Sequence, residues 1–180
     1  VVAAPVAEAI SCDLDLIITR KIGAPYQPEL ALGAVTGDGF ILLNDSVLSR
    51  LAVDEAYIKE ASEKEIQEIK RRLGVYRGSR PLPEINNRTV ILIDDGVATG
   101  YTLLAALRSL QQQNPEKLIL AVPVGPPETL SRLEKEVDKL IYIEAPSHFA
   151  AVGQFYRNFD QVGDDEVVNI LNKIWDTKKD

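Results

Sequence analysis

The residues best suited to chemistry lie in one stretch, where two adjacent acids are followed by a short loop of small side chains. Asp94 and Asp95 come directly after the apolar run 90–93, and residues 96–100 contain only glycine, valine, alanine and threonine. Small side chains let a ligand approach the backbone closely, and the free N–H groups at the start of a helix favour an anion. The acids would repel that anion, so they are better suited to sugar hydroxyls or to a bound Mg²⁺. A phosphate on the loop with hydroxyls on the acids describes a ribose 5-phosphate.

The elements on either side of this loop follow from the pattern of apolar residues. Residues 90–93 form a continuous apolar run rich in β-branched side chains, which predicts a buried parallel strand. After Gly100, the residues Leu103, Leu107 and Leu110 recur at helical spacing. Because α/β sheets bind ligands outside the carboxyl ends of their strands, this predicted strand–loop–helix unit puts the acids at a binding position.

Residues 90–102 resemble the signature of the type I phosphoribosyltransferases, which is an apolar run, an acid pair and a small-residue loop. Gly96 departs from the family pattern, which usually has an aliphatic residue or a serine there. The resemblance implies transfer of ribose 5-phosphate from phosphoribosyl pyrophosphate to a nitrogenous acceptor base, with Asp94 and Asp95 as the catalytic acids at the ribose. It also implies Mg²⁺ held mainly through the substrate, with the same two acids as candidate ligands. The residues expected to bind the 5-phosphate are Gly96, Val97, Ala98, Thr99, Gly100, Tyr101 and Thr102.

Two further groups of residues receive roles from the same resemblance. Arg20 and Lys21 follow a predicted strand, residues 14–19, and are therefore expected at the same edge of the sheet as the acid pair. Type I enzymes often have a basic residue after this strand that meets the pyrophosphate. The pocket for the acceptor base is expected in a hood segment, residues 147–159, which contains three of the four phenylalanines. Its candidate lining residues are Phe149, Phe155 and Tyr156, with packing in the core as the alternative role for these rings. Ala98 stands where 6-oxopurine enzymes have an aspartate that acts as general base, so the loop is closer to adenine- or orotate-type members.

The rest of the chain alternates predicted strands and helices. A loop punctuated by proline and glycine is expected at residues 22–33, a β-hairpin at residues 34–43 and a long charged helix at residues 53–73. Further strands are predicted at residues 118–122 and 140–143, and further helices at residues 1–10, 125–137 and 164–175. This alternation favours a doubly wound, mostly parallel α/β sheet, to which the resemblance adds a small hood.

Composition narrows the class of protein and its partners. The 180 residues carry a net charge of −7 and are 46% hydrophobic, as expected of one globular domain without nucleic-acid or membrane partners. The single cysteine, Cys12, excludes an intramolecular disulfide and favours a cytoplasmic location. The chain has no methionine. Residues 1–180 are therefore interpreted as a single phosphoribosyltransferase-like domain that lacks its N-terminal helix and first strand, and with them the loop that binds pyrophosphate in the family.

Two questions stay open at this point. The domain could be an enzyme, or a regulatory or binding module that senses phosphoribosyl pyrophosphate or a nucleotide with the same loop, and catalytic turnover separates these alternatives. The sequence also leaves open which base is the acceptor and whether the chain forms a homodimer.

Overall fold

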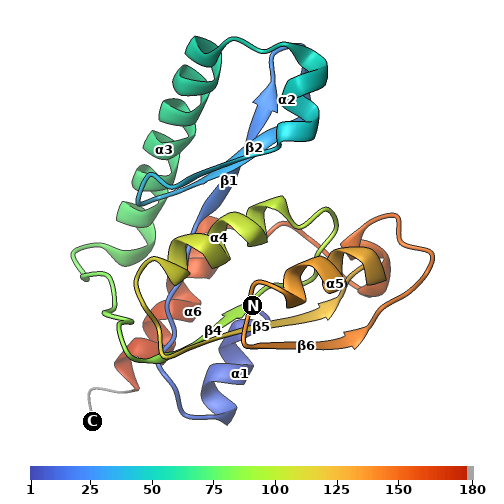
Figure 1. The fold of residues 1–180 in the computed structure, drawn as a ribbon. Helices are drawn as coiled ribbons and strands as arrows, with labels where there is room; N and C mark the ends of the chain where they lie inside the picture. The colour runs from blue at the N-terminus through green and yellow to red at the C-terminus, as the bar shows by residue number, and fades with distance from the viewer. Residues whose placement is uncertain (178–180) are drawn as a thin grey trace.

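The computed structural model describes residues 1–177, which form an α/β fold with two separate three-stranded sheets (Figure 1). The antiparallel sheet has the strand order β1 (Thr19–Ala24), β2 (Gln27–Thr36) and β3 (Ile41–Leu43). The parallel sheet has the order β4 (Thr89–Ile93), β5 (Lys117–Val124) and β6 (Lys139–Glu144). The predicted α/β class and parallel sheet are confirmed, and the antiparallel sheet is a second layer beside them.

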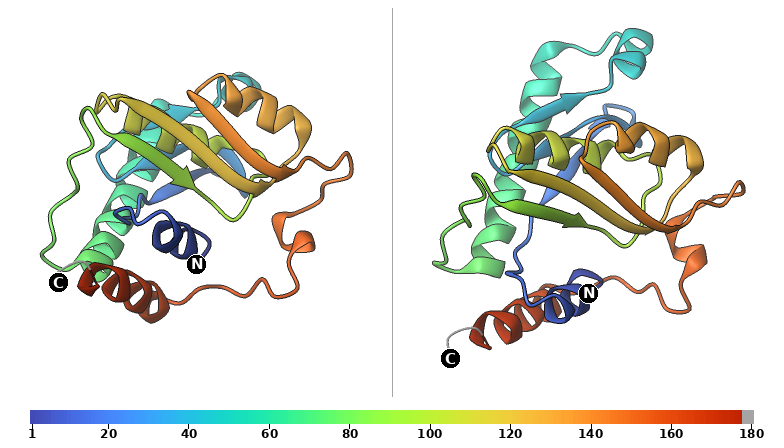
Figure 2. Two further views of the ribbon diagram at one scale, coloured as in Figure 1. Left: turned by 90° about the horizontal axis from the view of Figure 1, so that it is seen from below. Right: turned by 60° about the horizontal axis from the view of Figure 1, so that its bottom comes forward.

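Helices separate and cover the two sheets. They are α1 (Ala3–Ala9), α2 (Asp45–Leu51), α3 (Glu55–Arg77), α4 (Tyr101–Gln111), α5 (Pro127–Glu134) and α6 (Asp164–Asp176). Helices α4 and α5 lie on one face of the parallel sheet, and α1 and α6 lie below its other face (Figure 2). Within residues 1–177, none of these helices is long and apolar enough to cross a membrane.

Helix α4 is the centre of the larger hydrophobic core because it lies between the two sheets. A helix that is covered on two sides must be apolar around most of its circumference, and residues 103–107 of α4 are all buried. They pack against Leu118, Leu120 and Val122 of β5 and, on the other side, against Ala34 of β2. A second cluster joins the antiparallel sheet to α3. Helix α4 is thus held between the two sheets, and the loop that follows β4 leads directly into it.

Two predictions for the N-terminal part of the chain are wrong. Residues 14–19 were expected as a strand, but residues 14–18 have no regular secondary structure and Thr19 begins β1. Residues 22–33, expected as a loop, belong mostly to β1 and β2. Glycine has a packing role in these strands, since a Cβ on Gly33 would overlap the carbonyl oxygen of Leu42 in β3. The glycine therefore permits close approach of two strands, and was misinterpreted as a loop signal.

The other predicted elements agree with the structure to within a few residues at their ends. The hairpin at residues 34–43 is formed by β2 and β3, while α3 is longer than predicted and α2 was not predicted. Within residues 1–177, β4 pairs with β5 alone, and its other edge lines a cavity of about 690 Å³ together with residues 14–19. This cavity separates part of the N-terminal segment from the parallel sheet.

Candidate functional site

The small-residue loop connects β4 to α4 and exposes its middle. Val97 anchors it, since its N–H donates to the carbonyl of Val124 at 2.9 Å and its side chain is only 3% exposed. At the other end Gly100 has a φ of +74° and is the N-cap residue of α4. Between these anchors Ala98 and Thr99 are exposed. The loop is therefore fixed at both ends and open between them.

The backbone donors of the open part are available to a ligand. Within residues 1–177, the N–H groups of Ala98, Thr99 and Gly100 donate no hydrogen bond. The same holds for Tyr101 and Thr102, because the first N–H groups of a helix have no carbonyl a turn earlier within it. A cluster of free N–H groups at a helix start suits an anion such as a phosphate.

The acid pair follows β4 directly and is partly buried. The backbone N–H of Asp95 donates to Oδ1 of Asp94 at 2.9 Å, which orients the Asp94 carboxylate. Burial and the neighbouring charge of Asp95 raise the pKa of Asp94 to about 6, although that hydrogen bond opposes the rise. Burial also raises the pKa of Asp95. Two carboxylates that are costly to ionise here would gain from hydroxyl donors or from a positive charge close by.

The predicted hood, residues 147–159, contacts the acid pair. The hydroxyl of Tyr156 donates to the carbonyl of Asp95 at 2.6 Å, and burial together with the nearby acids raises the pKa of Tyr156. The rings of Phe149 and Phe155 are stacked, with centroids 5.3 Å apart. The structure thus brings Tyr156 to the acids, while Phe149 and Phe155 contact each other in the same segment, which contains one short 3₁₀ turn, Val152–Phe155.

The hood also explains the glycine at position 96. A Cβ on Gly96 would lie 2.7 Å from Cγ1 of Val152, inside van der Waals contact. The hood therefore closes on the backbone of the loop, and only glycine leaves room for it. The departure of Gly96 from the family pattern is matched by the position of Val152, which sequence reasoning did not single out.

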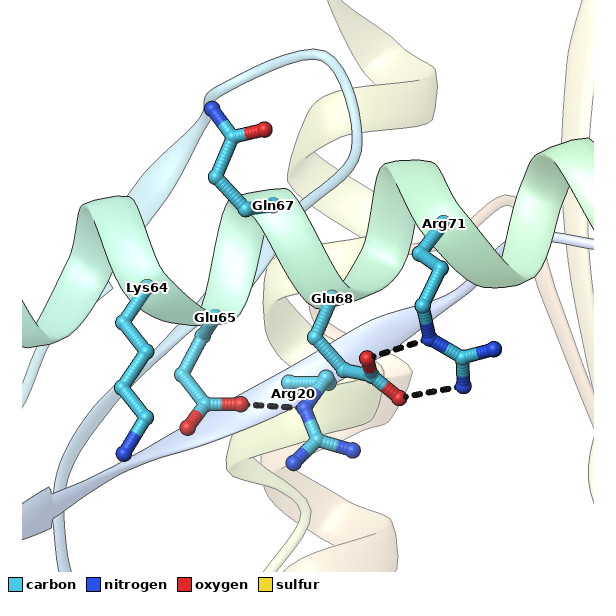
Figure 3. A pocket seen from close by; sticks show the side chains of 6 residues that line it. All are labelled: Arg20, Lys64, Glu65, Gln67, Glu68 and Arg71. Carbon is cyan, nitrogen blue, oxygen red and sulfur yellow. Dashed lines mark hydrogen bonds and ion pairs between the residues drawn. The ribbon is translucent and has the colours of Figure 1, made fainter.

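Arg20 and Lys21 lie on β1 and form ion pairs away from the loop. Arg20 donates to the carboxylate of Glu65 in a groove of about 470 Å³ that is otherwise lined by α3 (Figure 3). The Nζ atom of Lys21 is 3.0 Å from Oε2 of Glu29 across the hairpin. Within residues 1–177, neither cation bonds to residues 94–102. They are not brought together with the acid pair in this conformation, and their role at a pyrophosphate stays a prediction.

Two residues at the loop were missed from the sequence. Thr129 Oγ1 donates to the carbonyl of Ala98 at 2.8 Å, and Arg132 donates to the carbonyl of Thr99. Both side chains belong to α5, which follows β5, the strand beside β4. A signal existed, because helices after neighbouring parallel strands begin at the same edge of a sheet. It identifies the helix, but the sequence did not show which of its side chains face the loop.

The donor set at the site fits a Mg²⁺ ion held chiefly by substrate. Within residues 1–177, no group of three or more His, Cys, Asp or Glu side chains could hold a metal ion by itself. Asp94 and Asp95 supply carboxylate oxygens beside the free N–H groups of the loop. Since Mg²⁺ is commonly bound through one or two carboxylates together with substrate phosphates, these residues fit that arrangement and do not form a complete metal cage.

The family follows from comparison with known proteins. Residues 28–160 match the model of the phosphoribosyl transferase domain, and the chain belongs to that family. A Mycobacterium tuberculosis protein named "Putative phosphoribosyl transferase" is 39% identical over 172 residues, which are 96% of this chain and 39% of that protein. The chain thus spans less than half the length of this relative.

Two other relatives extend the comparison. A uracil phosphoribosyltransferase of Mycoplasma genitalium is 30% identical over 112 residues, covering 54% of this chain and 52% of that enzyme. The crystal structure of TT1426 from Thermus thermophilus superposes with a TM-score of 0.78 at 37% identity, covering 96% of this chain and 81% of the other. The recognised family and the α/β fold are therefore confirmed.

Proposed function

We propose that this chain transfers ribose 5-phosphate from phosphoribosyl pyrophosphate to a nitrogenous base and releases pyrophosphate. The observation that carries the proposal is the continuity of the acid pair, Asp94 and Asp95, with a loop whose N–H groups are free from Ala98 to Thr102. Acceptors for sugar hydroxyls and donors for a phosphate are adjacent, as one ribose 5-phosphate group requires. Membership of the phosphoribosyl transferase domain family supports the same class of reaction.

The reaction divides the work among these groups. The bond between C1′ and the pyrophosphate oxygen breaks with its electron pair leaving on the pyrophosphate, while the base nitrogen bonds to C1′ and releases a proton to solvent. Positive charge develops on the sugar, as in glycoside cleavage. Asp94 and Asp95 accept hydrogen bonds from the ribose hydroxyls and offset that charge. The loop holds the 5-phosphate, which keeps C1′ in place between the incoming base and the departing pyrophosphate.

Mg²⁺ is part of this proposal. Asp94 and Asp95 would contact the ion, with substrate oxygens completing its coordination. Bound there, it would neutralise charge on the departing pyrophosphate.

The acceptor base is proposed to lie under the hood. Phe149, Phe155 and Tyr156 would wall in a flat ring, because base–aromatic stacking is favourable for every base. The hydrogen bond from Tyr156 to the carbonyl of Asp95 ties this wall to the ribose site. Ala98 offers no carboxylate to act as general base, so an acceptor that needs one there is disfavoured. Uracil is a first candidate for the acceptor, since two relatives named uracil phosphoribosyltransferase match part of the chain.

Arg20 and Lys21 are proposed to meet the pyrophosphate after giving up their present partners. Their ion pairs with Glu65 and Glu29 are partly exposed to solvent, and such pairs contribute little stability. A pyrophosphate can therefore compete for the two cations.

A location in the cytoplasm and assembly as a homodimer belong to the same proposal, to be tested by cell fractionation and by light scattering.

The test is a panel of nucleobases offered with phosphoribosyl pyrophosphate and Mg²⁺, with release of pyrophosphate as the readout. Base-dependent release by the wild-type protein, lost in the Asp94→Asn/Asp95→Asn double variant, is the expected result. A crystal soaked in ribose 5-phosphate should show the phosphate at residues 98–102. Binding without release for every base would favour the regulatory alternative, and a ligand bound elsewhere with this loop empty would contradict the proposal.

A further inference from the structure

Two side chains of α5 hold the carbonyl groups of the exposed part of the loop. Thr129 Oγ1 donates to the carbonyl of Ala98 at 2.8 Å, and Nη2 of Arg132 donates to the carbonyl of Thr99. These carbonyls belong to the two consecutive peptide groups that precede the N-cap residue of α4, Gly100.

The geometry of a peptide group turns these contacts into an effect on the ligand side. A trans peptide is planar, and its C=O and N–H bonds point in opposite directions; the chain has no cis peptide bond among its described residues. Carbonyls of Ala98 and Thr99 that face α5 therefore direct the N–H groups of Thr99 and Gly100 away from it. Both N–H groups lack a hydrogen bond within residues 1–177. Helix α5 thus orients two free N–H donors, those of Thr99 and Gly100, away from itself.

Gly100 lets α5 come this close to the loop. A Cβ on Gly100 would lie 2.9 Å from Cγ2 of Thr129 and 3.1 Å from Nη2 of Arg132, and its φ of +74° is unfavourable for other residues. The guanidinium carbon of Arg132 also lies 5.2 Å from the ring centroid of Tyr101. The contact is therefore extensive, with groups from both the loop and α5.

The environment of Arg132 is not the one that would give the protein the greatest stability. Its Nε atom is buried and has no hydrogen-bond partner within residues 1–177, and a buried donor without a partner lowers stability. A methionine of similar length would fill the same space without that donor. The arginine keeps instead a hydrogen bond to the loop and a positive charge beside an anion site.

We propose that Thr129 and Arg132 are positioning residues that orient the phosphate loop, an inference that rests on the proposed function of that loop. They act through the peptide groups of residues 98–100 and need not touch the ligand. Without them the loop would have to order its N–H groups at the expense of phosphate affinity.

The test compares variants that keep or remove each hydrogen bond. Thr129→Val preserves the shape of the side chain without its hydroxyl, and Thr129→Ser restores the hydroxyl. Arg132→Met removes the guanidinium, and Arg132→Lys keeps a charge and one donor. Inorganic phosphate and ribose 5-phosphate are titrated into each protein, with affinity from calorimetry and with the ¹⁵N-labelled amide signals of Thr99 and Gly100 as the local readout.

We expect Thr129→Val to weaken binding about tenfold and Arg132→Met by about ten- to a hundredfold, as for loss of one neutral and one charged hydrogen bond. Thr129→Ser should stay within about twofold of wild type, with Arg132→Lys between the two extremes. The melting temperature of Arg132→Met should be unchanged or higher. The matched control is Arg108→Met, which removes an arginine paired with Glu136 at 2.9 Å and should leave phosphate affinity unchanged.

The outcomes separate this inference from the proposed function. Suppose that the wild-type amides of Thr99 and Gly100 respond to phosphate, but Thr129→Val and Arg132→Met bind phosphate as tightly as the wild type does. The positioning role is then wrong, while the loop remains a phosphate site. If the variants weaken as expected but the wild-type protein transfers no ribose 5-phosphate, the transfer activity is what fails. If the wild-type amides do not respond at all, both are wrong.

Discussion

Replacing Asp94 by asparagine should stabilise the protein at neutral pH while it weakens ribose 5-phosphate binding. Asparagine keeps the Oδ1 acceptor for the N–H of Asp95, which lies 2.9 Å away, so the local hydrogen bond survives. What the substitution removes is a partly buried negative charge next to Asp95. The two effects have opposite signs because the charge is unfavourable for the empty fold and useful to the ligand.

The size of the effect follows from the pKa of Asp94, which burial and the charge of Asp95 raise from 3.8 to about 6. Each pKa unit corresponds to about 1.4 kcal/mol, so ionisation of Asp94 costs the folded state at most about 3 kcal/mol. In the window from 3.8 to about 6, the folded protein binds more protons than the unfolded chain. Stability therefore falls as pH rises through that window. The asparagine that replaces Asp94 would not titrate. The variant should therefore be as stable as the wild type near pH 3.8 and more stable than the wild type above about pH 6.

The assay is urea unfolding of both proteins from about pH 4 to about pH 8, analysed as the difference in free energy of unfolding at each pH. Asp160→Asn, at an exposed position, is the matched control, whose difference should be small throughout. Calorimetry with ribose 5-phosphate at neutral pH completes the experiment. A difference for Asp94→Asn that is the same at every pH, or a variant less stable than wild type at neutral pH, would refute the reasoning.

Three further predictions concern the hood and the core. Gly96→Ala should destabilise the protein by about 1–3 kcal/mol because the new methyl group meets Val152; adding Val152→Ala should recover most of that loss, and independent effects in a double-mutant cycle would contradict the contact. Phe155→Ala should raise the KM of the acceptor base about ten- to a hundredfold with little change in affinity for phosphoribosyl pyrophosphate, whereas equal loss of both with a lower melting temperature would mean that the ring only packs. Ser109 donates to Oδ2 of Asp38 at 2.7 Å, and although burial would raise the pKa of Asp38, its hydrogen bonds hold that pKa below the usual value. Stability from Asp38 is thus present at neutral pH and lost as pH falls, so Ser109→Ala should cost about 1 kcal/mol at neutral pH and less in acid; a cost independent of pH in thermal melts would speak against this link.

The local sequence pattern was sufficient to predict the structure where the residues of one functional unit are contiguous in the chain. The apolar run of β4, the acids Asp94 and Asp95 and the small residues to Gly100 are contiguous, so the strand, the loop and the start of α4 could be predicted together. Strands β5 and β6 were predicted from the same kind of continuous apolar run. The proposed ribose site could be assigned to the loop after β4 because parallel strands put their carboxyl ends at one edge of the sheet.

Contacts between distant segments could not be predicted in the same way. Gly33 was interpreted as part of a loop, but a neighbouring strand lies too close there for any side chain. Arg20 was expected at the end of a strand, at the same sheet edge as the acids, but it lies within β1 of the antiparallel sheet and donates to Glu65 of α3. The closure of Val152 on Gly96 likewise joins residues that the sequence separates widely.

The sequence by itself therefore determined the chemistry of the loop, because residue types and their order along one turn fix which donors and acceptors are adjacent. Only the tertiary structure decided what holds that loop and what covers it. The hold of Thr129 and Arg132 on its carbonyls and the hydrogen bond of Tyr156 to Asp95 depend on how α5 and the hood pack. Packing distances between segments remote in sequence leave no periodic pattern along the chain, and so they are set only when the sheets and helices come together.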